Sequence, residues 1–213
     1  MVSLDSLDPG VSGAAAGTGV YPRCRTVVRR NGIDNSWLLL IYTVPAEPSR
    51  KRAFIWREVK KIGAVYLRDG VCALPDQPDT ASALQAIAEK IQEFEGEATL
   101  VEGARLDSTR ADWVIAQSRA ARTAEYADIA SQAGRLLDHI ARETQHREFT
   151  FAELEELEAD LGKINRWVKQ VRGRDYFAAG PDETLQSLLD RCEQSMGAFL
   201  EATAGRDAET RVE

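Results

Sequence analysis

The sequence predicts an α+β protein, because the spacing of its apolar residues changes once along the 213 residues. Up to about residue 106, short apolar runs typical of strands alternate with two amphipathic stretches typical of helices, in the order βαββαβ. From residue 108 onward only the three-and-four spacing of helices remains. We therefore expect a ferredoxin-like βαββαβ domain followed by an antiparallel helical bundle.

The first predicted strand is Trp37 to Val44, a near-continuous apolar run that favours a strand buried on both faces and central in its sheet. Pro45 ends it. A helix should follow, with Ser49 as its cap, Ile62 near its end and Gly63 as its stop. Its buried face is predicted at Ile55, Val59 and Ile62.

Two short strand-like runs then flank Asp69-Gly70, the dipeptide that a type I′ hairpin prefers because both central residues need positive φ. Asp79 or Thr80 should cap a second helix that ends near Phe94. Ala98 to Val101 is the last predicted strand. The segment is therefore expected to form a four-stranded sheet with two helices.

The second half shows three apolar seams with helical spacing. They begin at Tyr126, Leu154 and Leu185, with breaks at 148–150 and at 180–181. Thr150 and Glu153 form a predicted capping box for the middle helix, in which each side chain binds the other residue's amide. The expected layout is a disordered tail over 1–35, the sheet domain over 36–106, the bundle over 107–205 and a second disordered tail over 206–213.

Composition excludes several classes of protein. The longest apolar run is far shorter than the ~20 residues of a membrane span, and the start lacks the apolar core of a secretory signal. The three cysteines are widely spaced and show no C-x-x-C pattern. We expect a cytoplasmic protein that contacts no membrane and holds its thiols reduced.

A basic cluster stands out in a chain whose net charge is −7. In the first predicted helix, Arg50, Arg57 and Lys61 share one sector with Phe54 beside them. Several cations that reach a polyanion together, with an exposed aromatic ring among them, would suit phosphate recognition and stacking. A solvated basic face is the alternative. The candidate nucleic-acid-binding residues are Arg50, Lys51, Arg52, Phe54, Arg57, Lys60 and Lys61.

A second basic stripe lies on the middle bundle helix. It is a candidate anion-binding site formed by Arg166, Lys169, Arg172 and Arg174. The alternative is a set of surface salt bridges, which need no function to exist.

Arg119 and Arg122 fall on the apolar register that precedes Tyr126. In the alternative we favour, the seam starts only at Tyr126. In the other, these guanidinium groups face an interface that supplies an anion or an acidic partner, since unpaired buried charges are costly.

Motifs for catalysis are missing from the sequence. His139, Glu143 and His146 could share one helix face, but their spacing lacks the H-E-x-x-H pattern, so we predict no metal site and no cofactor. No G-x-S-x-G, Walker or G-x-G-x-x-G motif follows a predicted strand. We expect a protein that is not an enzyme.

Two blocks of the chain resemble the N-terminal region of the chromate-resistance regulator family, ChrB. The first runs from Trp37 through the hairpin to Pro75 and includes Pro48-Ser49, Trp56-Arg57 and Gly63-Ala64. The second contains Phe149 to Glu156, Arg166-Trp167 and the run Arg174-Asp175-Tyr176-Phe177. The two blocks agree with the family in order and spacing.

The resemblance implies a transcriptional regulator of the chromate-resistance type that binds the operator DNA of a resistance operon. For this chain, which stops at Glu213, we expect the regulator half without the chromate-resistance C-terminal domain. DNA contact would fall on Arg50, Arg52, Arg57 and Lys61. A chromate-type oxyanion as effector and a homodimer are the further expectations.

Two other functions compete with this interpretation. In the first, the bundle docks a partner protein and no DNA is bound, which predicts an exposed apolar seam. The second follows from a more distant similarity to phenylacetate-type repressors and CRISPR adaptation nucleases. Those nucleases carry an aspartate after the strand's tyrosine, whereas here Thr43 follows Tyr42. A hydroxyl cannot replace that carboxylate as a metal ligand, so nuclease activity is disfavoured.

Overall fold

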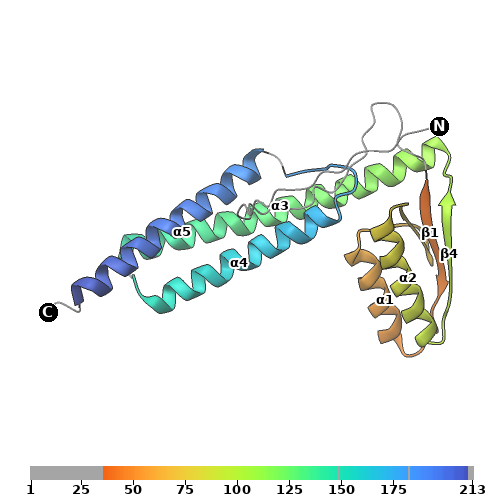
Figure 1. Cartoon of the computed structure of the whole chain (residues 1–213), viewed down its shortest axis with the longest axis horizontal. Helices are drawn as coiled ribbons and strands as arrows, with labels where there is room; N and C mark the ends of the chain where they lie inside the picture. The colour runs from red at the N-terminus through yellow and green to blue at the C-terminus, as the bar shows by residue number, and fades with distance from the viewer. Residues whose placement is uncertain (1–35, 148, 182, 211–213) are drawn as a thin grey trace, which may run out of the picture.

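The computed structural model describes residues 36–147, 149–181 and 183–210 (Figure 1). The tail predicted over 1–35 lies outside the described residues. The first part has the predicted order βαββαβ, namely β1 (Trp37–Thr43), α1 (Ser49–Lys61), β2 (Val65–Arg68), β3 (Val71–Pro75), α2 (Pro78–Glu93) and β4 (Glu97–Ala104). The second part consists of α3 (Ser108–His146), α4 (Phe151–Gly173) and α5 (Glu183–Thr210).

The α+β class is confirmed. The strands form one antiparallel sheet in the order β2-β3-β1-β4, and three long helices that pack together follow it. As predicted, β1 is central and contributes to two cores. Leu38 and Leu40 are buried on the face covered by α1 and α2. Trp37 is buried on the other face, against Val114 of α3.

Both predicted helix caps in the sheet domain need correction. Ser49 is the first helical residue of α1 and does not cap it, because Pro48 holds the N-cap position. In α2 the N-cap is Gln77, and its backbone amide donates to Thr80 Oγ1 at 3.1 Å. Proline suits the first helical position because its missing N–H is not needed there. Pro78 therefore starts α2 before the predicted caps.

The predicted hairpin is present, but its turn is not type I′. Only Gly70 of the central pair has positive φ, at +69°, and Asp69 is not among the described residues with positive φ. The pairing shifts between Tyr66 and Arg68, which indicates a bulge beside the turn. The local sequence thus predicted the hairpin correctly but not its turn type, because the bulge beside the turn changes the turn geometry.

The three predicted seams form one core between α3, α4 and α5, which includes Ile129, Leu157 and Cys192. Half of the predicted capping box is confirmed, since the Glu153 amide donates to Thr150 Oγ1 at 3.2 Å. The Glu153 carboxylate turns instead toward His139 of α3. Helix α5 continues to Thr210, beyond residue 205 where the bundle was expected to end.

Helix α3 joins the two parts of the molecule. Its first turns cover the sheet face opposite α1 and α2, and its remainder runs into the bundle (Figure 1). Cys72 and Cys192 are free and buried, and Cys24 lies outside the described residues. Within the described ranges, every helix is too short or too polar to cross a membrane.

Candidate nucleic-acid interface

The basic residues of α1 are positioned by the buried face of that helix. Ile55 and Val59 are fully buried between α1 and the sheet. Because side chains follow one another every 100° around a helix, this fixed face leaves the opposite side to solvent. Lys60 and Lys61 lie in the last turn, where positive charge complements the carbonyl end of the helix.

Five of the seven predicted nucleic-acid-binding residues are exposed, namely Arg50, Arg52, Arg57, Lys60 and Lys61. Lys61 lies 3.5 Å from Glu58 of the same helix but keeps 71% of its side chain exposed. Among the described residues, no carboxylate from the bundle pairs with any of these five cations. The solvent face of α1 therefore keeps its positive charge; we call these five residues together with Trp56 the α1 surface.

The other two predicted residues pack inward. Lys51 Nζ donates to Phe94 O at 3.2 Å and lies 3.4 Å from Glu95 Oε2. Phe54 is half-buried, with its ring edge-on to Phe94 at a centroid distance of 5.7 Å. The expectation that Phe54 offers an exposed stacking ring is wrong, because Phe94, the C-cap residue of α2, packs against it.

The exposed aromatic side chain of α1 is Trp56, which is 54% exposed. It lies four residues after Arg52 and four before Lys60, so the three share one edge of the helix. Sequence reasoning missed Trp56 because it looked for an aromatic ring beside Arg50. The same helical spacing, counted from Arg52, would have found it.

Two tyrosines of the sheet lie beside this edge of α1. Lys60 Nζ lies 5.6 Å from the centroid of the Tyr66 ring, and Tyr66 and Tyr42 share a hydroxyl hydrogen bond of 2.7 Å. Burial raises the pKa of both phenols above the ordinary value of 10. Both rings therefore stay neutral and add no negative charge beside Lys60.

The C-terminal end of α1 is bound to the bundle by a group of residues that we call the junction, namely Arg122, Glu125, Arg174, Asp175 and Tyr176. Arg174 Nη1 donates to Lys61 O at 3.4 Å, and Tyr176 Oη donates to Ile62 O at 2.9 Å. These donors satisfy carbonyls that a helix end leaves without an intrahelical partner. The junction thus fixes where the α1 surface lies relative to the bundle.

Arg122 is the buried charge of the junction. The residue is 6% exposed, and its Nε lies 2.8 Å from Glu125 Oε2. Burial lowers the pKa of Arg122, while the carboxylate of Glu125 opposes that shift. The favoured prediction, that the buried seam starts only at Tyr126, is therefore wrong, and the acidic partner is the alternative that holds. Arg119 is exposed and donates from Nε to Phe177 O at 2.9 Å.

The segment after α4 contacts both parts of the molecule. Asp175 accepts hydrogen bonds from the Tyr126 hydroxyl at 3.3 Å and from the amide of Gly180 at 2.7 Å. The centroid of the Phe177 ring lies 5.9 Å from the centroid of the Trp37 ring, in the core on the sheet face that α3 covers. Sequence similarity singled out the run 174–177, but no local pattern indicated that it joins two domains.

The predicted anion-binding stripe on α4 is only partly assembled. Arg166 and Lys169 are exposed. Arg172 Nη2 donates to Gln186 Oε1 at 3.0 Å, and Arg174 is held 2.8 Å from Glu125. The four side chains therefore do not converge on one open surface.

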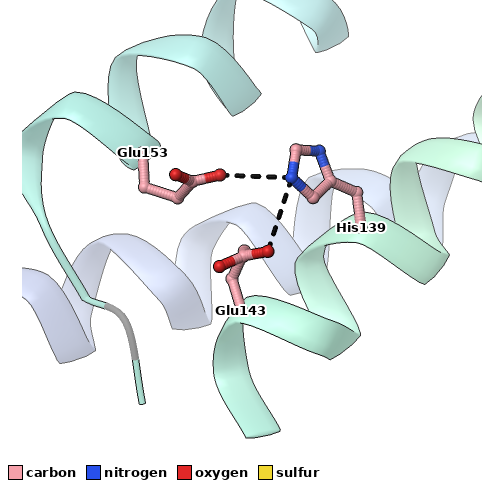
Figure 2. Close-up of side chains that lie close together, drawn as sticks. All are labelled: His139, Glu143 and Glu153. Atoms are coloured by element: carbon pink, nitrogen blue, oxygen red, sulfur yellow. Dashed lines mark ion pairs between the residues drawn. The ribbon is translucent and has the colours of Figure 1, made fainter. Parts of the chain in front are cut away.

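A separate polar cluster lies between α3 and α4 (Figure 2). His139 Nε2 lies 3.1 Å from Glu153 Oε1 and 3.6 Å from Glu143 Oε1. His146, which could share the face of His139 by spacing alone, is exposed. Spacing within one helix could not identify Glu153 as a partner of His139, because Glu153 lies on the next helix.

Comparison with known proteins gives two matches. The family model described as "Protein ChrB, N-terminal" matches residues 52–206, which include most of α1 and the whole junction. "Protein ChrB" of Cupriavidus metallidurans is 28% identical over 129 residues, an alignment that covers 51% of this chain and 40% of that protein. The match thus spans less than half of the relative's length.

Proposed function

The chain belongs to the ChrB N-terminal family, and on that premise we propose that it is a transcriptional regulator of the chromate-resistance type that binds DNA phosphates through the α1 surface. The observation that carries the proposal is the exposure of five cations on one helix, none paired with the bundle within the described ranges. Phosphate contacts of this kind position a protein on a duplex.

The charge of the whole chain favours a localised contact. With a net charge of −7, most of the surface repels a polyanion, so association should depend on the α1 surface. Trp56 adds an apolar face between Arg52 and Lys60 that can pack on sugar or base edges. The junction supports this role because it holds the end of α1 in one position.

Further parts of the proposal rest on the element order and on family membership. The sheet order β2-β3-β1-β4 with two helices on one face supports a ferredoxin-like domain. We propose that the protein acts without catalysis, as a homodimer in the cytoplasm, with a chromate-type oxyanion as effector.

The test is a titration of duplex DNA from the region upstream of the protein's own gene, followed by fluorescence anisotropy at several salt concentrations. The variant changes Arg50, Arg57 and Lys61 together to Ala. Its matched control changes Arg166, Lys169 and Arg172 of α4 to Ala, which removes the same charge from another surface. Circular dichroism checks the fold of both.

For the wild-type chain, log K should fall linearly with log salt, because each neutralised phosphate contributes a slope of about 0.9. The α1 variant should bind more weakly, with a slope reduced by up to ~2.7 for three lost contacts. The α4 control should bind like the wild type. Absent binding, a flat salt dependence, or an equal loss in the control would each contradict the proposal.

The alternative, a bundle that docks a partner protein, has less support. It predicted an exposed apolar seam, whereas the seam residues are buried among α3, α4 and α5. The large apolar side chains exposed on the described part of α4 and α5 are Phe151 and Leu200. Single exposed apolar residues are common on protein surfaces and indicate no particular partner.

A further inference from the structure

We propose that His139, Glu143 and Glu153 bind a divalent transition-metal ion, of which zinc is the representative, between α3 and α4. Figure 2 shows the imidazole of His139 and the carboxylates of Glu143 and Glu153 pointing toward one another from two helices. Their ligand atoms all lie within 4.8 Å of one another. This proposal does not depend on DNA binding.

Two of the three ligand separations are close to those around a tetrahedral ion. Ligand atoms bound to zinc at 2.0–2.1 Å in a tetrahedron lie about 3.4 Å from one another. The two separations from His139 Nε2, 3.1 Å to Glu153 and 3.6 Å to Glu143, lie on either side of that value. The two carboxylates, whose ligand atoms lie within 4.8 Å of each other, would complete the site by side-chain rotation.

The charges also favour a cation. Two carboxylates converge on one imidazole nitrogen, and among the described residues neither carboxylate pairs with an arginine or a lysine. All three side chains are largely buried, with 24%, 15% and 24% exposure for His139, Glu143 and Glu153. Like charges held close together away from water repel strongly, and a divalent ion would remove that repulsion.

The backbone holds the three side chains in place. His139 and Glu143 are four residues apart on α3, beside the buried Ile140. Glu153 lies in the first turn of α4, where its amide binds Thr150, and it precedes the buried Leu154. A site with its ligands fixed before binding loses little conformational entropy when the ion arrives.

One of the three proposed ligands borders a pocket. His139 lines a pocket that Arg142, Lys163 and Trp167 share. Lys163 is paired with Asp160 at 2.7 Å, which reduces its repulsion of an incoming cation. Three protein ligands leave a fourth tetrahedral position for water. The bound ion would link the end of α3 to the start of α4 and stabilise the bundle.

The experiment uses the full chain, freed of metal with a chelator, and titrates it with zinc chloride in a calorimeter and by thermal unfolding. The variants are His139→Asn, Glu143→Gln and Glu153→Gln, which retain the size of each side chain or a polar group. The matched controls are His146→Asn and Glu156→Gln, which are exposed residues on the same two helices. Circular dichroism checks the fold of each variant.

We expect one zinc ion per chain, a rise in the unfolding temperature on binding, and a loss of affinity of at least about tenfold in each cluster variant. The control variants should bind like the wild type. Imidazole nitrogen resonances of the wild-type chain provide a test that needs no variant, because zinc must shift those of His139 and leave those of His146 unchanged.

Three results would overturn the proposal. The first is no zinc binding by the wild-type chain, which would leave the cluster as polar contacts between a histidine and two carboxylates. The second is equal binding by the cluster variants. The third is a sulfur charge-transfer band when cobalt replaces zinc, because that band requires a cysteine ligand.

Discussion

Arg174 Nη2 lies 2.8 Å from Glu125 Oε1, and this ion pair joins the end of α4 to α3 beside the last turn of α1. The same carboxyl group lies 2.8 Å from Arg122 through its other oxygen. Glu125 thus balances two guanidinium groups at the point where the sheet domain meets the bundle. The orientation of the α1 surface depends on this arrangement.

Changing Glu125 to Gln should destabilise the folded protein by about 2–3 kcal/mol, because it removes the carboxylate shared by the buried Arg122 and the largely buried Arg174. The effect should be below that of a fully buried pair, since Glu125 keeps 27% of its side chain exposed. Arg122 Nη1 and Arg174 Nε already lack a hydrogen-bond partner among the described residues. Urea unfolding measures the change.

The control for that measurement is Glu58→Gln, which breaks the exposed pair with Lys61. Exposed pairs contribute about 0–1 kcal/mol, so the control should unfold nearly like the wild type. Equal urea midpoints for the two variants would show that the junction does not stabilise the fold.

Changing Gly63 to Ala should destabilise the protein by about 1–3 kcal/mol. Gly63 has a φ of +80°, and an added Cβ would lie 2.9 Å from Arg122 Nη1 and 3.2 Å from Arg174 Cβ. The matched control is Gly134→Ala inside α3, where, apart from the two neighbouring residues and the backbone of the same helix, no atom of the protein lies within 4 Å of the added Cβ. This control should be stabilised by up to about 1 kcal/mol. Thermal unfolding compares the two, and a Gly63 variant as stable as the control would contradict the close packing there.

Changing Trp56 to Ala should weaken binding to the upstream duplex on the order of fivefold, or ~1 kcal/mol. The variant removes apolar contact area but no charge, so the salt slope should stay unchanged. Phe151→Ala, which removes an exposed ring on α4, serves as the control for the anisotropy titration. If the two variants bind equally well, Trp56 lies outside the DNA contact.

Tyr126 should make the protein lose stability at high pH. Burial, and then the nearby carboxylate of Asp175, raise the pKa of Tyr126 from 10 to about 12. Because its folded-state pKa exceeds the unfolded value, the stabilising contribution is complete below pH 10 and is lost as the pH rises toward 12. Urea unfolding at pH 8 and at pH values within that window should show a smaller alkaline loss for Tyr126→Phe than for the wild type. An equal loss would show that Tyr126 does not contribute.

Local patterns predicted a large part of this structure. The apolar run in β1 and the three-and-four spacing of the later helices predicted the element order, because burial of one face imposes the period of each element. The exposed cations of α1 were predictable for the same reason. Once Ile55 and Val59 mark the buried side, the opposite side follows.

Contacts between distant segments could not be predicted in this way. Phe54 was expected to be exposed, but Phe94, the C-cap residue of α2, covers it. Glu153 was expected to complete its own helix cap, but a histidine of α3 attracts its carboxylate.

The sequence by itself thus determined which residues form helices and strands and which helix carries the positive charge, since both depend on neighbours within a few turns. Only the tertiary structure decided that Arg122 is buried. Its partner Glu125 lies three residues along the same helix, but Arg174, which shares that carboxyl group, is 49 positions from Glu125 in the sequence. A buried charge is tolerated when it has a partner. Here that partner is local, whereas the burial of Arg122 is a property of the assembled fold.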